Sequence, residues 1–213
     1  MSVLDVVIVD YGLGNLWSVK NAFEFMGARV TLSSDPAIVA AGKKLVLPGV
    51  GSFGAGMSNL HAGGLVDALN EAVLDKGAPI LGICLGMQLL ADASEEAPGS
   101  RGLGWIPGQV RKFTGKSLRL PHMGFNGASA ATANPIFHID APRPADFYFV
   151  HSYCFVPDDP AHVLARTHYG DNFTSAVRKD AIFGVQFHPE KSQSAGLKLI
   201  SNFLKFNAGD VHG

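Results

Sequence analysis

The sequence is poor in charged residues, and it contains no long uninterrupted apolar run. Only 16% of its 213 residues are charged, against about 25% in ordinary soluble chains, and 17 basic residues balance 18 acidic ones. This near-neutral balance excludes the clustered Lys and Arg residues of a nucleic-acid-binding surface. Because 47% of the chain is hydrophobic, the shortage of charge suggests that a partner covers part of the surface.

Cysteine is also scarce, since the chain has only Cys84 and Cys154. Two cysteines in a chain of this length do not form a disulfide framework, so we expect both to be reduced and the protein to be cytoplasmic. Residues 1–10 have no basic segment, so we do not expect them to be a signal peptide. The longest apolar stretch, 78–91, is interrupted by proline and glycine and is too short to span a bilayer.

The first half of the chain alternates apolar, β-branched runs with amphipathic segments. The runs are continuously apolar, as in strands of a parallel sheet that is covered on both faces. Between the first two runs, apolar residues recur at helical spacing from Leu16 to Met26. We expect strands at 3–9, 29–32, 44–47 and 79–83, and helices at 15–26 and 60–75.

Beyond Ser94 turn residues become frequent and the apolar runs become short. Their spacing is typical of antiparallel or mixed strands. We expect strands at 110–113, 147–150, 163–167, 175–178 and 182–187, and a last helix at about 195–206. Together the two halves predict one α/β domain over 1–213, with a central, mostly parallel sheet flanked by helices and a smaller antiparallel or mixed sheet in the second half.

Cys84 lies in a Gly-x-Cys-x-Gly pattern, where a buried strand is expected to turn directly into a helix. In the related serine pattern, glycines allow a tight turn that presents the central side chain in a strained, exposed position. A helix N-terminus favours a thiolate there, and the backbone N–H of Leu85 is available to an oxyanion. The other reading is a small apolar core residue, which is how we interpret Cys154.

A thiolate nucleophile needs a base and usually a group that orients the base. His188 follows the last expected strand, Pro189 ends that strand, and Glu190 comes two residues after the histidine. Side chains at the carboxyl ends of parallel strands meet in the crevice where α/β proteins place their sites. The order therefore predicts a Cys84–His188–Glu190 triad, against the alternative of a strand-end histidine beside a surface glutamate.

The two motifs 82–88 (GICLGMQ) and 186–190 (QFHPE) resemble those of class I, or triad-type, glutamine amidotransferases. Within that family the chain is most similar to the glutaminase subunits of imidazole glycerol phosphate synthase, an enzyme of histidine biosynthesis. The segments that carry this closer resemblance are 10–16 (DYGLGNL), 48–53 (PGVGSF), 121–126 (PHMGFN), 149–153 (FVHSY) and 188–192 (HPEKS). One difference is Phe125, which stands where relatives commonly have Trp.

The resemblance implies that the Cys84 thiolate attacks the side-chain amide of glutamine and forms a glutamyl thioester. His188 then protonates the leaving ammonia and activates the water that releases glutamate. The oxyanion donors implied by the family are the backbone at Leu85 and at Val50–Gly51. The implied substrate-binding residues are Gln88, His151, Ser152 and Tyr153, and no cofactor or metal is implied.

The resemblance also implies a heterodimer with a (βα)8-barrel cyclase/synthase subunit. That partner uses the ammonia to make imidazole glycerol phosphate and aminoimidazole carboxamide ribotide (AICAR). The interface candidates are Asn15, Met123, Phe125, Asn126 and Lys191. We further expect little glutaminase activity without the partner, because the Val50–Gly51 peptide presents its N–H only after the partner binds its own ligand.

The sequence leaves three other functions open. The chain could feed another synthase, as the glutaminase of a pyridoxal phosphate synthase does, or be a stand-alone cysteine γ-glutamyl hydrolase. The 10–16 and 121–126 segments argue against the first. A non-catalytic interaction subunit is the third possibility, and the intact Cys84, His188 and Glu190 argue against it.

Overall fold

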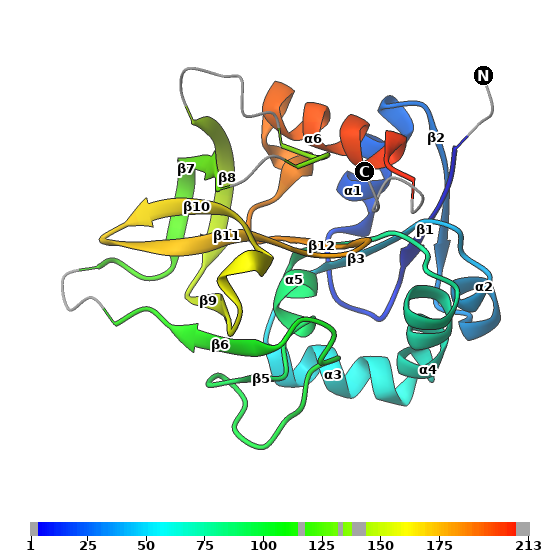
Figure 1. Ribbon diagram of the computed structural model, residues 1–213. Helices are drawn as coiled ribbons and strands as arrows, with labels where there is room; N and C mark the ends of the chain where they lie inside the picture. The colour runs from blue at the N-terminus through cyan, green and yellow to red at the C-terminus, as the bar shows by residue number, and fades with distance from the viewer. Residues whose placement is uncertain (1–3, 115–117, 132–133, 138–143, 208–213) are drawn as a thin grey trace.

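The computed structural model describes residues 4–114, 118–131, 134–137 and 144–207 (Figure 1). Its main feature is a nine-stranded sheet with the order β2-β1-β3-β4-β12-β11-β10-β7-β8. In that order the strands are β2 (Ala28–Ser33), β1 (Leu4–Val9), β3 (Leu45–Gly49), β4 (Ile80–Cys84), β12 (Ile182–Val185), β11 (Asp171–Lys179), β10 (Val163–Tyr169), β7 (His122–Ala130) and β8 (Ala145–His151).

The large sheet is parallel at one end and antiparallel at the other. Strands β2, β1, β3, β4 and β12 pair in parallel, whereas β11, β10, β7 and β8 add antiparallel pairs. A second sheet of three strands contains β5 (Ala93–Ser94), β6 (Gly108–Lys112) and β9 (Tyr153–Pro157). The predicted α/β class and the smaller mixed sheet are confirmed, although most strands of the second half extend the main sheet.

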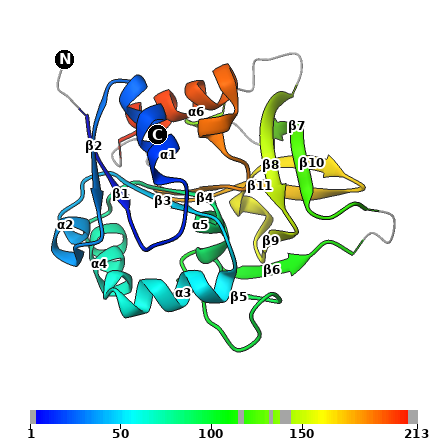
Figure 2. The same cartoon turned by 180° about the vertical axis from the view of Figure 1, so that it is seen from behind.

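Helices cover both faces of the parallel part (Figures 1 and 2). On one face lie α1 (Leu16–Phe25) and α6 (Gln193–Lys205); on the other lie α2 (Pro36–Ala40), α3 (Phe53–Ala62), α4 (Leu65–Asn70) and α5 (Leu85–Leu89). Each face of the sheet has its own hydrophobic core, one under α1 and α6 and the other under α3 and α4. Successive residues of β3 point into opposite cores: Val46 packs in the first, and Leu45 and Leu47 pack in the second. The continuous apolar runs are therefore strands buried on both faces.

The single helix predicted at 60–75 is wrong. Helix α3 begins earlier, after the N-cap Ser52, and ends at Ala62, where Gly63 and Gly64 follow. Gly64 has a φ of 65°, a left-handed conformation that breaks the helical path before α4 begins. After α4 the chain makes a π-helical turn, η1 (Glu71–Asp75). Helix α2 and strands β5, β7 and β9 were not predicted from the sequence.

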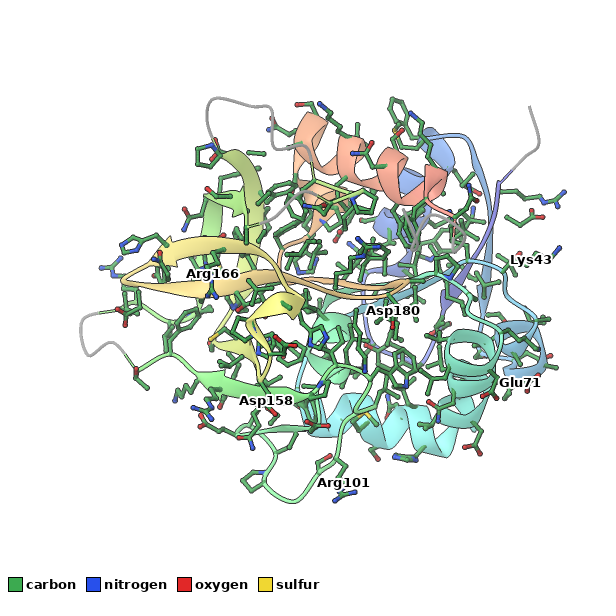
Figure 3. All side chains as sticks on the ribbon, in the orientation of Figure 1. Lys43, Glu71, Arg101, Asp158, Arg166 and Asp180 are labelled. Carbon is green, nitrogen blue, oxygen red and sulfur yellow. The ribbon has the colours of Figure 1, made fainter. Side chains whose placement is uncertain are left out.

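Charged side chains lie mainly on the surface, and six exposed examples are labelled in Figure 3: Lys43, Glu71, Arg101, Asp158, Arg166 and Asp180. Lys44 is a buried exception. Its ammonium group donates to the carbonyl oxygens of Phe203, Leu204 and Phe206 at 2.9, 2.6 and 2.7 Å. These acceptors lie at the end of α6, so Lys44 ties the last helix to the sheet. Within the described ranges, no helix is long and apolar enough to cross a membrane.

Candidate active site

Cys84 occupies the junction between β4 and α5, as the glycine pattern predicts. Its backbone has φ 55° and ψ −106°, a conformation that residues with a side chain rarely adopt. A Cβ on Gly82 would lie 2.7 Å from the carbonyl carbon of Gly86, and one on Gly86 would lie 1.7 Å from the carbonyl oxygen of Leu47. Only glycine fits at either position, so these two residues allow the tight turn that holds Cys84.

His188 and Glu190 form a buried pair beside this turn. The Nδ1 atom of His188 lies 2.8 Å from Oε1 of Glu190, and their side chains are 4% and 1% exposed. The backbone around His188 is fixed as well. Its N–H donates to the carbonyl oxygen of Tyr148 at 2.8 Å, and its own carbonyl oxygen accepts from the hydroxyl of Ser192 at 2.5 Å. The hydrogen bonds thus hold the imidazole in one orientation.

The neighbours of His188 favour its charged form. Burial lowers the pKa of His188, but its interactions with the Cys84 and Glu190 side chains outweigh burial and raise it to about 9. Nδ1 faces Glu190, and Nε2 is buried without a hydrogen-bond partner among the described residues. The Nε2 atom is therefore the one available to exchange a proton at Cys84 or at a bound substrate.

The Val50–Gly51 segment, which is predicted to donate to the oxyanion, lies directly beside Cys84. Gly49, the last residue of β3, pairs with Cys84 at the end of β4, and Val50 and Gly51 follow it. Val50 is 40% exposed, and Gly51 has a φ of 113°, which favours glycine. Leu85, whose N–H is the other predicted donor, is the first residue of α5. Cys84, Val50, Gly51 and Leu85 are thus adjacent.

Tyr11 is a buried neighbour of this segment that the sequence analysis did not single out. A Cβ on Gly49 would lie 2.0 Å from the Tyr11 hydroxyl, so the ring lies directly against the backbone of β3. Burial, followed by the charge of Cys84, raises the pKa of Tyr11. Its hydroxyl has no hydrogen-bond partner in the part of the chain that the structure describes.

The predicted substrate-binding residues also meet at this site. The amide nitrogen of Gln88 donates to the carbonyl oxygen of Tyr153 at 3.2 Å and to Oε1 of Gln186 at 3.1 Å. Nδ1 of His151 donates to the same Tyr153 carbonyl at 2.8 Å. Gln88 and His151 are buried, while Ser152, between β8 and β9, and Tyr153, the first residue of β9, are half-buried. Gln88 therefore uses one amide proton to hold the β9 backbone and the other to hold the side chain of Gln186.

Gln186 is a second residue that the sequence analysis did not single out. It follows β12, it is 0% exposed, and its amide nitrogen lies 3.8 Å from Sγ of Cys84. The carbonyl oxygen of Val150 lies 4.0 Å from the same sulfur. A signal was present in the sequence, because Gln186 is the polar residue in an otherwise apolar run, 182–187.

Two buried histidines extend the polar contacts away from the cysteine. Nδ1 of His122 lies 3.0 Å from Nε2 of His151, and Nε2 of His122 lies 3.2 Å from the amide nitrogen of Asn126. Burial lowers the pKa of His122 to about 4 and that of His151 to about 3. Both rings are therefore neutral near pH 7, which makes His151 unsuitable as a source of protons there.

The predicted interface residues fall near one another on the surface. The rings of Phe125 and Tyr148 are 5.6 Å apart, and Nζ of Lys191 lies 5.7 Å from the Tyr148 ring centroid. Met123 and Phe125 are 62% and 54% exposed. Asn15 caps α1, which contacts the 3-10 turn η3 (Pro189–Lys191). Asn126 is half-buried, and its amide also donates to the carbonyl oxygen of His168.

Cys154 is a buried residue of β9 and has no disulfide partner. Burial, followed by the charge of Glu95, raises the pKa of Cys154 to about 11. This thiol is therefore protonated near pH 7 and unreactive, as expected of a core residue. Among the described residues, no group of three or more His, Cys, Asp or Glu side chains is arranged to hold a metal ion.

A strained cysteine beside a buried imidazole–carboxylate pair, at the carboxyl end of a parallel sheet, is the arrangement of enzymes that attack acyl carbons through a thiolate. The comparisons with known proteins identify the family. A family model of class-I glutamine amidotransferases matches residues 7–206, and the chain belongs to that family.

Similar curated proteins are subunits of one particular enzyme. The chain is 48% identical over 201 residues to the imidazole glycerol phosphate synthase subunit HisH of Chlorobium luteolum, an alignment that covers 94% of this chain and 99% of the relative. It is 46% identical over 210 residues to subunit HisH of Halobacterium salinarum, with 95% and 94% covered.

Solved structures agree on the fold. A crystal structure of a glutamine amidotransferase superimposes with a TM-score of 0.74 at 21% identity, covering 95% of this chain and 98% of that one. A chain of the PurLQS structure from Thermotoga maritima gives a TM-score of 0.75 at 17% identity, with 96% and 99% covered.

Proposed function

We propose that this chain is the glutaminase subunit of an imidazole glycerol phosphate synthase, acting in the cytoplasm through one amidotransferase domain over residues 1–213. The relatives at 43–48% identity that bear this subunit name support the assignment. The single observation that carries the chemistry is the placement of Cys84 beside the buried His188–Glu190 pair.

The reaction begins when the Cys84 thiolate attacks the side-chain carbonyl carbon of glutamine. The carbonyl oxygen becomes an oxyanion, which accepts hydrogen bonds from the backbone of Leu85 and of Val50–Gly51. His188 gives a proton to the departing nitrogen, and ammonia leaves a glutamyl thioester on Cys84. His188 then takes a proton from water, the hydroxide attacks the thioester, and glutamate is released with the thiolate restored.

Gln88 and the 151–153 segment bind the substrate. Both amide protons of Gln88 are engaged, and no described residue donates to its Oε1 atom. This oxygen is the atom with which Gln88 binds the α-ammonium group of glutamine. His151, neutral and bonded to the Tyr153 carbonyl, positions the 151–153 segment that forms the other substrate contacts.

The partner is a (βα)8-barrel cyclase/synthase subunit that receives the ammonia and forms a heterodimer with this chain. The exposed face around Met123, Phe125 and Lys191, together with Asn15, is the surface that meets it. Clustered exposed apolar side chains such as Met123 and Phe125 are typical of such interfaces. Phe125 and Tyr148 provide an aromatic platform there.

The test is glutamine hydrolysis by the purified chain, alone and with its barrel subunit carrying the barrel's ligand. We expect low turnover alone and strong stimulation by the liganded partner. Full turnover by the isolated chain would contradict partner dependence and favour a stand-alone γ-glutamyl hydrolase. If neither preparation hydrolyses glutamine, the proposed activity is wrong.

A further inference from the structure

Gln186 has a buried amide that the proposed reaction does not use. The residue lies between Val185 and Phe187, which are fully buried, and its own side chain is 0% exposed. Its backbone N–H donates to the carbonyl oxygen of Ser175 at 2.9 Å, which fixes the start of the side chain. A carboxamide in such surroundings is costly unless it is hydrogen-bonded, and one of its two neighbours is the sulfur of Cys84.

The direction of these hydrogen bonds is determined by the carbonyl oxygen of Tyr153. A carbonyl oxygen only accepts, so the Gln88 atom 3.2 Å away must be the amide nitrogen. The same nitrogen lies 3.1 Å from Gln186, so the atom that faces it on Gln186 must be the acceptor Oε1. The remaining end of the Gln186 carboxamide, its NH₂ group, therefore faces the Cys84 sulfur at 3.8 Å.

The Tyr153 carbonyl is itself held from its other side. It accepts from Nδ1 of His151, which makes Nε2 of that ring an acceptor. Nδ1 of His122 must then donate to it, and Nε2 of His122 accepts from the amide of Asn126. The donors and acceptors from Asn126 to Tyr153 are therefore mutually consistent. Turning the Gln186 carboxamide around would leave at least one of these groups without a suitable partner.

We propose that Gln186 is a further catalytic residue of this site, whose side-chain N–H donates a hydrogen bond to the Cys84 sulfur. The proposal rests on the proposed function, since it assigns a role in the attack by that sulfur. The Val150 carbonyl at 4.0 Å suits a thiol, which can donate to it, but disfavours a thiolate. Gln186 supplies the opposite contact, a neutral donor that stabilises the anionic sulfur before attack and again when the thioester is hydrolysed.

The test compares Gln186→Met with a control at a neighbouring buried position, Ser175→Ala. The methionine keeps the length of the side chain and removes the donor. The Ser175 hydroxyl has no hydrogen-bond partner within the described residues, so Ser175→Ala perturbs the same packing and removes no contact to the sulfur. Gln186→Leu is a second donor-free variant in case Gln186→Met does not fold.

Two measurements are made on each protein. The first is the rate of alkylation of Cys84 by iodoacetamide at pH 7, followed by mass spectrometry of the Cys84 peptide. The second is kcat and KM for glutamine in the complex with the barrel subunit. A hydrogen bond to a charged group is worth roughly 10- to 100-fold in rate, so we expect Gln186→Met to lower alkylation and kcat by that factor and Ser175→Ala to change neither.

The outcomes separate the two proposals. Alkylation within about twofold of wild type in a folded donor-free variant overturns the role of Gln186, as does an equal loss in Ser175→Ala. An effect on KM alone assigns Gln186 to support of Gln88 and also overturns it. If both donor-free variants fail to fold, Gln186 is a core residue only. A wild-type complex that does not hydrolyse glutamine refutes the proposed function, whereas the alkylation result still decides the contact to sulfur.

Discussion

Replacing Glu190 by glutamine tests the buried pair with the smallest change of shape. The variant keeps the side-chain length and removes the charge that faces Nδ1 of His188 at 2.8 Å. Because the pair is nearly inaccessible to water, the lost charge-assisted hydrogen bond costs about 1.5–3 kcal/mol, or roughly 10- to 100-fold in rate. If the new amide donates to Nδ1 instead, it selects the wrong tautomer, and the loss approaches about 10⁴-fold.

The assay is steady-state glutamine hydrolysis by the complex with the barrel subunit. We expect kcat to fall by about 10- to 10⁴-fold with KM little changed, because Glu190 acts through His188 and does not contact the substrate. The pKa of His188, followed by NMR, should fall below about 9 in the same variant, since Glu190 is one of the groups that raise it. A folded Glu190→Gln complex that retains kcat within about threefold would refute the role of Glu190.

Three further predictions concern stability, measured by urea unfolding. Gly49→Ala places a methyl group 2.0 Å from the Tyr11 hydroxyl and should lower the free energy of unfolding by about 1–3 kcal/mol. Adding Tyr11→Leu should recover part of this loss, and additive losses in the double variant would contradict the contact. Lys44→Met removes the donor to three carbonyl groups at the end of α6 and should cost about 3 kcal/mol, whereas the exposed neighbour Lys43→Met should cost little; equal losses would contradict this. Burial holds the pKa of His151 at about 3, below its value in the unfolded chain. The contribution of His151 to the free energy of unfolding is therefore present above about pH 6.5 and is lost as the pH falls. His151→Phe should therefore remove about 2 kcal/mol of the stability difference between pH 7 and pH 5, and an unchanged difference would show that His151 is not held neutral.

The strands of the parallel half could be predicted from the sequence because most of them are continuous apolar runs and the turns that follow carry glycine or proline. The helix predicted at 60–75 failed because its apolar spacing continues across Gly63 and Gly64, where the backbone turns. Strand β7 was missed because its pattern is weak and it forms by pairing with β8 and β10, which are distant in the sequence.

The positions of Cys84 and His188 were predictable because glycines and a proline mark the turns that hold them. Tyr11 was not, and Gln186 carried only the signal of one polar residue in an apolar run, because the importance of both depends on distances across the sheet. In the sequence, a glutamine near a strand end cannot be distinguished from other polar residues. Only the structure shows that its amide lies 3.8 Å from the Cys84 sulfur. The roles of the substrate-binding and interface residues stay predictions.

The role of Cys84 in releasing ammonia is tested most directly by comparing two nitrogen sources in the complex of Cys84→Ala with the barrel subunit. Synthesis of imidazole glycerol phosphate is followed with glutamine and, separately, with an ammonium salt. We predict that glutamine-dependent synthesis is lost while ammonium-dependent synthesis continues at the wild-type rate. Synthesis from glutamine by the variant, or loss of both activities in a folded complex, would contradict the central claim that Cys84 releases the ammonia that the partner consumes.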